Sequence, residues 1–236
     1  GKPTPEHTVA LAGNPNTGKS ALFNALTGLN QHTGNWPGKT VRVAEGFSMH
    51  KGAWFRLIDL PGTYSLLASS KEEEVARDLI CFGAPDVTVV VTDATCLERN
   101  LDLVLEILEV TSRVVVALNL VDEAYRKKIS IDILGLSSSL GVPVVPTVAR
   151  LGRGLRRLMD TVQAVADGHI MTDPLGPKYD ERIEGIVSLI ENTIQRDSCS
   201  LPPRWIALRL LDGDPELRDE LFERLTRAVS EGGMSA

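Results

Sequence analysis

The chain has 236 residues, of which 43% are hydrophobic and 24% charged, close to the composition of ordinary folded domains. Because 31 acidic side chains outnumber 25 basic ones, the formal net charge is −6, and this balance argues against a nucleic-acid-binding protein with a broad basic surface. The longest apolar runs, at 87–91 and 114–118, fall far short of the roughly 18 to 20 residues of a membrane-spanning helix. These residues are therefore not expected to cross a bilayer.

Strand-like apolar runs alternate with helix-like segments from residue 8 to about residue 166. The runs cover 8–12, 43–49, 54–59, 87–92, 113–118 and 142–146. Helical spacing of apolar residues predicts helices at 21–27, 70–80, 97–108 and 155–162. This alternation predicts an α/β fold, with a mostly parallel central sheet flanked by helices on both faces.

The pattern is interrupted at 167–178, a stretch rich in glycine, proline and aspartate. Beyond it, apolar residues at 183–194, 205–211 and 217–225 predict a small all-helical unit of three helices. We therefore expect a first domain over 1–168 and a helical domain over 169–236. So short a helical unit would be marginal alone, so we expect it to pack on the first domain.

A phosphate-binding loop is the clearest motif. The segment Gly13-Asn14-Pro15-Asn16-Thr17-Gly18-Lys19-Ser20 matches GxxxxGK[ST] between the first predicted strand and the first predicted helix. In such a loop, backbone N–H groups surround an anion at a helix N-terminus, the lysine reaches the β- and γ-phosphates, and the serine ligates Mg²⁺. The predicted nucleotide-binding residues are Gly13, Asn14, Pro15, Asn16, Thr17, Gly18, Lys19, Ser20 and Ala21.

Two further motifs follow later strands and complete a nucleotide site. In Asp59-Leu60-Pro61-Gly62, the carboxylate is placed to hold a Mg²⁺ water and the glycine N–H to sense a γ-phosphate. In Asn119-Leu120-Val121-Asp122, the aspartate can accept two hydrogen bonds from the N1–H and N2–H₂ edge of guanine, which adenine lacks. The alternative is that Asp122 only caps the next helix.

A third element, Thr147-Val148-Ala149, follows the last predicted strand, where a backbone N–H can meet the guanine carbonyl. The carboxyl ends of parallel strands share one edge of a sheet. Together these elements predict a guanine-nucleotide site, with GTP or GDP as its ligand and Mg²⁺ as its metal.

The motifs resemble those of translation-factor-type GTPases and, more narrowly, of the N-terminal cytoplasmic part of the bacterial ferrous iron transport protein B family. The narrower resemblance rests on the segments Asn14-Pro15-Asn16-Thr17, Thr33-Gly34-Asn35-Trp36-Pro37-Gly38-Lys39-Thr40 and Asp59-Leu60-Pro61-Gly62-Thr63-Tyr64-Ser65-Leu66. It covers 8–166, and the tail resembles the family's appended helical domain by position. It implies a P-loop GTPase fold and slow GTP hydrolysis that regulates or powers Fe²⁺ uptake.

The resemblance also implies roles for individual residues. Thr40 matches the first-switch threonine that joins Ser20 and Asp59 at Mg²⁺. Asn16 matches an asparagine of potassium-activated members, in which backbone carbonyls matching Gly34 and Trp36 complete a K⁺ site. Such a cation could supply the charge that an arginine finger gives elsewhere. The catalytic residues implied are Asn16, Lys19, Thr40 and Gly62.

Three positions depart from common GTPase patterns. Thr63 follows DxxG where many signalling GTPases have a water-orienting glutamine, so slow intrinsic turnover is expected. Leu120 takes the place of a common lysine, and Val148 stands where serine is usual. The lost side-chain contacts predict weaker nucleotide affinity and faster GDP release.

The implied partners are the chain's own C-terminal membrane region for Fe²⁺, and a small cytoplasmic accessory protein or a second copy. The implied location is the cytoplasmic face of the bacterial inner membrane. The three cysteines suggest neither a disulfide framework nor a zinc site, which fits a reducing cytoplasm. Two alternatives stay open: a soluble potassium-dependent GTPase of ribosome assembly or tRNA modification, and a GTP-dependent binding module with negligible turnover.

Overall fold

The computed structural model describes residues 3–28, 31–35, 41–66, 70–174, 176, 179–193, 202–213 and 219. The chain divides into two compact units, Gly1–Leu175 and Gly176–Ala236. The sequence prediction placed the domain boundary at residue 168. Both positions follow the last helix of the first unit, α6 (Leu155–Ala166), so the difference concerns only the irregular chain after it.

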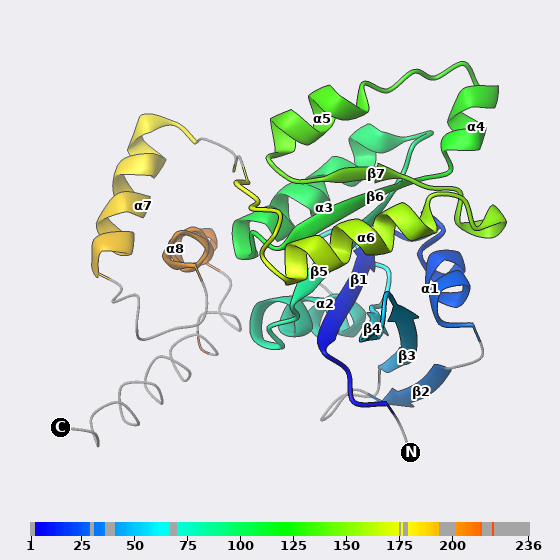
Figure 1. Ribbon diagram of the computed structural model, residues 1–236. Helices are drawn as coiled ribbons and strands as arrows, with labels where there is room; N and C mark the ends of the chain where they lie inside the picture. Colours follow the sequence, from blue (N-terminus) through cyan, green and yellow to red (C-terminus); the bar gives the residue numbers. More distant parts are fainter. Residues whose placement is uncertain are drawn as a thin grey trace. The chain divides into compact units, whose positions relative to one another are not determined.

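The first unit is built on a seven-stranded sheet with the order β2-β3-β4-β1-β5-β6-β7 (Figure 1). β1 pairs in parallel with β4 and β5, and β6 and β7 continue the parallel part, while β2 and β3 form an antiparallel edge. The strands are β1 His7–Gly13, β2 Gln31–Asn35, β3 Arg42–His50, β4 Ala53–Asp59, β5 Val87–Asp93, β6 Val114–Asn119 and β7 Val144–Pro146. The predicted α/β fold with a mostly parallel sheet is confirmed.

All six predicted strands are present, and β2 is an additional one. Its sequence, Gln-His-Thr-Gly-Asn, has no alternating apolar residues. It is a strand because its backbone pairs with β3, with Gly34 opposite Val43. Periodicity in the sequence does not reveal pairing of this kind.

Helices connect the strands. They are α1 Lys19–Thr27, α2 Lys71–Phe82, α3 Leu97–Val110, α4 Val121–Arg126, α5 Ile133–Leu140, the 3₁₀ turn η1 Ala149–Leu151, and α6. Figure 1 shows α1 and α6 on one face of the sheet and α2 and α3 behind the other. Ser70 caps the N-terminus of α2, because its hydroxyl accepts a hydrogen bond from the Glu73 N–H.

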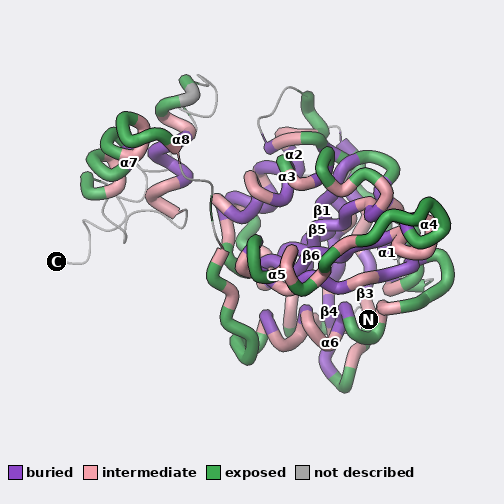
Figure 2. The backbone as a smooth tube through the Cα atoms, turned by 90° about the horizontal axis from the view of Figure 1, so that it is seen from above, coloured by how far each residue is buried: buried purple, intermediate pink, exposed green. Residues whose placement is uncertain are grey.

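The main core fills the space between the sheet and the helices α1 and α6. Alternate residues of a strand point to the same face of a sheet, so each strand contributes every second side chain. The core residues from strands include Val9, Leu11, Phe55, Leu57, Val89, Val91, Val115 and Ala117, and those from helices include Leu22, Phe23, Leu158, Met159 and Val162. Figure 2 shows these buried strands enclosed by helices whose outer sides are exposed. This rigid core supports the loops at the carboxyl ends of the strands.

The second unit contains α7 (Glu181–Thr193) and α8 (Pro203–Asp212). They pack through Val187, Ala207 and Leu208. Ile186 is 45% exposed, because it lies one residue, about 100° around the helix, from the buried Val187. The third helix predicted around 214–225 lies almost entirely outside the described residues.

Within the part of the chain that the structure describes, no helix has the length and apolar character that a membrane crossing requires.

Truncation of Leu158 to alanine is expected to lower the free energy of unfolding by about 2 to 5 kcal/mol, because it leaves a cavity in the main core. Leu158 is fully buried in α6, whereas Leu134 of α5 is 81% exposed. The matched control Leu134→Ala should change stability by no more than about 0.5 kcal/mol. Urea unfolding followed by circular dichroism measures both, and equal effects would contradict this assignment of the core.

Candidate functional site

The predicted phosphate loop lies between β1 and α1. Asn16 and Gly18 have positive φ angles of 68° and 83°, which turn the loop around a central hollow. The loop borders a cavity of about 450 Å³, within the range of small-ligand sites. Its lining residues are Asn14, Pro15, Asn16, Gly18, Lys19, Ser20, Ala21 and Gly62. The structure thus brings Gly62, from the loop after β4, to the phosphate loop.

Lys19 and Ser20 both contact Asp59 at the end of β4. The Lys19 ammonium lies 2.5 Å from Oδ1 of Asp59 and 2.5 Å from the Leu60 carbonyl oxygen. The Ser20 hydroxyl lies 3.3 Å from Oδ2 of Asp59. A hydroxyl beside a carboxylate supplies the oxygen donors that Mg²⁺ prefers, so these two side chains fit that metal.

The side chain of Asn119, at the end of β6, joins two loops. Its Nδ2 donates to the Thr17 carbonyl of the phosphate loop over 2.9 Å. Its Oδ1 accepts from the Thr147 hydroxyl at 3.2 Å and from the Ala149 N–H at 3.0 Å. Asn119 is only 1% exposed, so these bonds replace water that cannot reach it. The bridge fixes the phosphate loop relative to the loop after β7.

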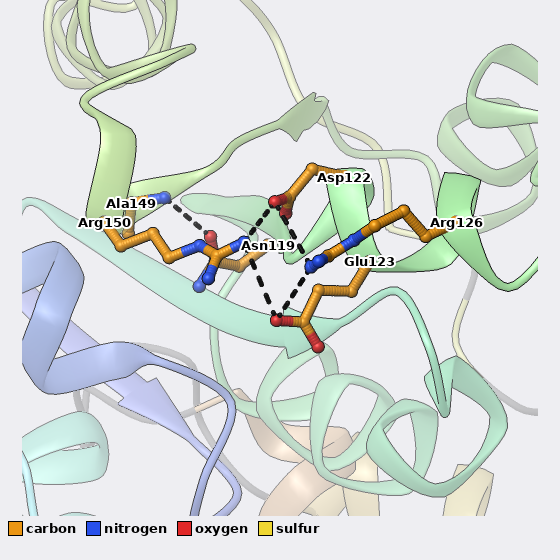
Figure 3. A network of polar contacts seen from close by, with 6 residues as sticks. All are labelled: Asn119, Asp122, Glu123, Arg126, Ala149 and Arg150. Carbon is orange, nitrogen blue, oxygen red and sulfur yellow. Dashed lines mark hydrogen bonds and ion pairs between the residues drawn. The ribbon is translucent and has the colours of Figure 1, made fainter.

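Asp122 lies in the first turn of α4, within a cluster of four charged side chains (Figure 3). Its Oδ2 accepts a hydrogen bond from Arg150 at 2.5 Å, and this bond lowers the pKa of Asp122 below its ordinary value. Its Oδ1 is buried and has no hydrogen-bond partner among the described residues. A buried carboxylate oxygen without a partner is suited to accept an N–H from a ligand.

A second cavity, of about 630 Å³, adjoins this carboxylate. Its lining residues include Asp122, Tyr125, Thr147, Val148, Arg150, Leu151 and Arg153. The predicted base-binding elements therefore lie around one hollow, at the carboxyl ends of β6 and β7.

The segment Thr147-Val148-Ala149 is predicted to offer a backbone N–H to a guanine carbonyl, but all three of its N–H groups donate within the protein. The Thr147 N–H bonds to the Leu118 carbonyl, and the Val148 N–H bonds to the Arg153 carbonyl. The Ala149 N–H bonds to Asn119. A base carbonyl would have to share one of these donors, so this contact stays a prediction.

The segment after Gly62, residues 63–66, is held by hydrogen bonds within it and to α3. The Thr63 hydroxyl donates to the Ser65 carbonyl at 2.5 Å, and Thr63 is 1% exposed. Glu106 of α3 accepts from the Ser65 hydroxyl at 2.8 Å and from the Leu66 N–H at 2.6 Å. The Thr63 hydroxyl also lies 3.3 Å from Oε1 of Glu73 in α2, so its side chain is engaged within the protein and poorly placed to orient water.

The geometry of the described residues does not test the predicted K⁺ site. Asn16 lines the phosphate-loop cavity. Gly34 lies in β2, and the sheet places β3 and β4 between β2 and β1. Trp36 and Thr40 lie outside the described residues. The K⁺ ligands and the Thr40 contact to Mg²⁺ therefore stay predictions.

Sequence reasoning missed two residues that shape the site, Arg150 and Glu106. Arg150 directly follows the predicted base-binding segment, so its position in the sequence indicates that it lies near the base site. Glu106 gives no such signal, because its contacts reach 40 residues back along the chain to Leu66.

A doubly wound sheet with a GxxxxGK[ST] loop after its central strand and an Asn-x-x-Asp segment two strands away has the fold and site of a P-loop G domain. The model of the family described as ferrous iron transport protein B matches residues 7–162, and that of the FeoB cytosolic helical domain matches 179–231. The chain belongs to the ferrous iron transport protein B family.

Individual relatives agree. The Fe(2+) transport protein A/Fe(2+) transporter FeoB fusion protein of Porphyromonas gingivalis is 42% identical over 214 residues, which cover 89% of this chain and 25% of that protein. The Fe(2+) transporter FeoB of Salmonella typhimurium is 38% identical over 212 residues, covering 88% and 27%. The chain thus spans about a quarter of the length of the curated relatives it matches.

Among solved structures, the cytosolic domain of T. maritima FeoB is similar in two forms. Its GDP form I has a TM-score of 0.86 at 41% identity, covering 94% of this chain and 87% of that one. Its GMPPNP form has a TM-score of 0.86 at 41% identity, covering 92% and 86%. The expected combination of a G domain and a helical domain is confirmed.

Replacement of Asn119 by alanine is expected to lower the free energy of unfolding by about 1 to 3 kcal/mol, because buried partners lose their hydrogen bonds. Urea unfolding without added nucleotide measures this structural role apart from any ligand. The control Asn192→Ala, at an exposed position of α7, should change stability by no more than about 0.5 kcal/mol. An Asn119→Ala protein as stable as the wild type would contradict the bridge.

Proposed function

We propose that this chain binds and hydrolyses GTP, and that hydrolysis regulates or powers Fe²⁺ uptake through a membrane region of the whole transporter. The Asn119 bridge carries this proposal, because it joins the phosphate-loop cavity to the cavity beside Asp122. One nucleotide could occupy both cavities, with its phosphates in the phosphate-loop cavity and its base in the cavity beside Asp122. The GDP and GMPPNP forms of the T. maritima domain support such a ligand.

The phosphate end supplies positive charge and backbone donors. The loop Gly13 to Ala21 would surround the phosphates, and Lys19 would leave Asp59 to bind the β- and γ-phosphates. Ser20 and Asp59, joined by Thr40, would hold Mg²⁺, which neutralises phosphate charge when bound. Gly62 packs against Pro15 so closely that a Cβ would lie 3.3 Å from the Pro15 Cα. This closeness to the phosphate loop supports the proposal that the Gly62 N–H senses a γ-phosphate.

The base end selects guanine. Asp122 is ionised at neutral pH, as an ordinary aspartate is, and the hydrogen bond from Arg150 lowers its pKa further. An ionised carboxylate accepts from both N1–H and N2–H₂ of guanine, while adenine would leave it unpaired. Thr147, Val148 and Ala149 would supply the backbone donor for the guanine carbonyl, and Asn119 would hold that loop in place.

Hydrolysis is proposed to be slow and stimulated by K⁺. Because the Thr63 hydroxyl is bound to Ser65, backbone groups near Thr40 and Gly62 would place the attacking water. Asn16, with the carbonyls of Gly34 and Trp36, would hold K⁺ beside the phosphates. Its charge would act where other GTPases use an arginine finger.

The proposed setting is the cytoplasmic face of the bacterial inner membrane. The curated relatives are Fe(2+) transporters about four times as long as the matched region, so the membrane region is the expected partner. The relative in P. gingivalis carries Fe(2+) transport protein A in the same chain, which supports a small accessory protein as a second partner. The domains are proposed to be 1–168 for nucleotide binding and 169–236 for the helical part.

GTP hydrolysis by this chain is expected to be several-fold faster in KCl than in NaCl of equal ionic strength. Asn16→Ala should remove the difference, because the side-chain oxygen would be a K⁺ ligand, while the exposed α1 control Asn24→Ala should keep it. Phosphate release under multiple turnover measures the rates. Equal rates in both salts would contradict stimulation by K⁺. No hydrolysis in either salt would favour a binding module with negligible turnover.

Replacement of Asp122 by asparagine is expected to weaken GDP binding by about tenfold or more, because two charge-assisted hydrogen bonds are lost. The amide should instead favour xanthosine diphosphate, whose carbonyl at position 2 accepts a hydrogen bond. Calorimetry with both nucleotides measures the switch. The control Asp102→Asn, at an exposed position of α3, should keep the guanine preference. An Asp122→Asn protein that still prefers GDP would show that Asp122 does not read the base.

A further inference from the structure

The charged cluster around Asp122 contains Arg150, which has no role in the proposed function. Arg150 lies 2.5 Å from Oδ2 of Asp122 and 3.9 Å from Oε1 of Glu123. Arg126 lies 3.7 Å and 3.4 Å from the same two carboxylates. Figure 3 shows both guanidinium groups between the two acidic side chains. The four charges balance, and Arg150 makes the shortest contact with Asp122.

The backbone around Arg150 is well fixed. Arg150 is the middle residue of η1, which Gly152 ends in the left-handed conformation with a φ of 68°. On either side, Val148 and Arg153 exchange two backbone hydrogen bonds of 3.0 and 3.2 Å. The Ala149 N–H is tied to Asn119. The fold therefore holds the Arg150 side chain within reach of Asp122.

A guanine base needs both oxygens of Asp122, one for N1–H and one for N2–H₂. Oδ1 is buried without a partner among the described residues, while Oδ2 is bonded to Arg150. The base and Arg150 are thus alternative partners of the same carboxylate oxygen.

We propose that Arg150 competes with guanine for Asp122 and so lowers the affinity of the site for guanine nucleotides. The proposal rests on the proposed role of Asp122 as the reader of the guanine edge. When the base bonds to Oδ2, Arg150 turns to Glu123, which already lies 3.9 Å away. The displaced guanidinium keeps a carboxylate partner, so the exchange costs little and is readily reversed.

The expected change in GDP affinity follows from the solvent exposure of the Arg150–Asp122 ion pair. The Arg150 side chain is 50% exposed and that of Asp122 21% exposed. Ion pairs of this kind contribute little, so removing the competitor should tighten GDP binding by about two- to fivefold. High salt screens the pair, so the gain should shrink as KCl rises.

The test compares Arg150→Ala with wild type by titration of fluorescent GDP. The control Arg156→Ala removes a positive charge from an exposed residue of α6 that lines neither cavity. Arg150→Ala should bind GDP about two- to fivefold more tightly, whereas Arg156→Ala should not. Weaker or unchanged binding in Arg150→Ala, or an equal gain in Arg156→Ala, would overturn the competition.

A double variant separates the two proposals. In Asp122→Asn, measured with xanthosine diphosphate, the added change Arg150→Ala should leave affinity unchanged, because the neutral amide does not form the ion pair. The same gain in both backgrounds would show that Arg150 acts elsewhere, and would overturn the inference alone. If Asp122→Asn still prefers GDP, the proposed base recognition fails and the competition with it.

Discussion

The buried amide of Asn119 is the interaction on which the geometry of the site depends. One side chain at the end of β6 bonds the phosphate loop through Thr17 and the base loop through Ala149. The amide can come so close because Gly18 has no Cβ, which would collide with Nδ2 of Asn119. An unpaired buried polar group is costly, so loss of either half of the bridge would also weaken the fixed spacing of the two loops. The second glycine of the phosphate motif therefore serves the base end of the site as well.

Two of the groups proposed to bind ligand, Lys19 and Asp122, each have an ion-pair partner in this structure. Lys19 pairs with Asp59 in a nearly buried contact, and Arg150 pairs with Asp122 near the surface. Leaving a buried charge unpaired is costly, so Lys19 can leave Asp59 only for another anionic partner. A ligand at Lys19 or at Oδ2 of Asp122 therefore replaces an existing partner. The free energy of binding is then a difference between two sets of ion pairs, which favours exchange over tight retention.

Much of the fold and half of the site could be predicted from the sequence. The phosphate loop is a local motif, and the buried parallel strands show themselves as apolar runs, so both were found. β2 could not be found, because only pairing with β3 makes Gln31–Asn35 a strand. The short α4 and α5 lack a long apolar stripe. Contacts such as Arg150 with Asp122, 28 residues apart, depend on how the loops fold, so the position of Arg150 after the base-binding segment does not by itself predict its partner.

Glu106 connects the loop after Gly62 to α3, which lies on the other face of the sheet from α1 and α6. Its carboxylate holds both the Ser65 hydroxyl and the Leu66 N–H, and α3, which carries it, packs behind β5 and β6. Gly62 itself rests on Pro15 of the phosphate loop. A displacement of Gly62 must therefore either break two hydrogen bonds to Glu106 or pull on α3. The Glu106 carboxylate therefore links the phosphate loop to α3. Through it, a small movement of Gly62 would be passed to a helix on the other face of the sheet.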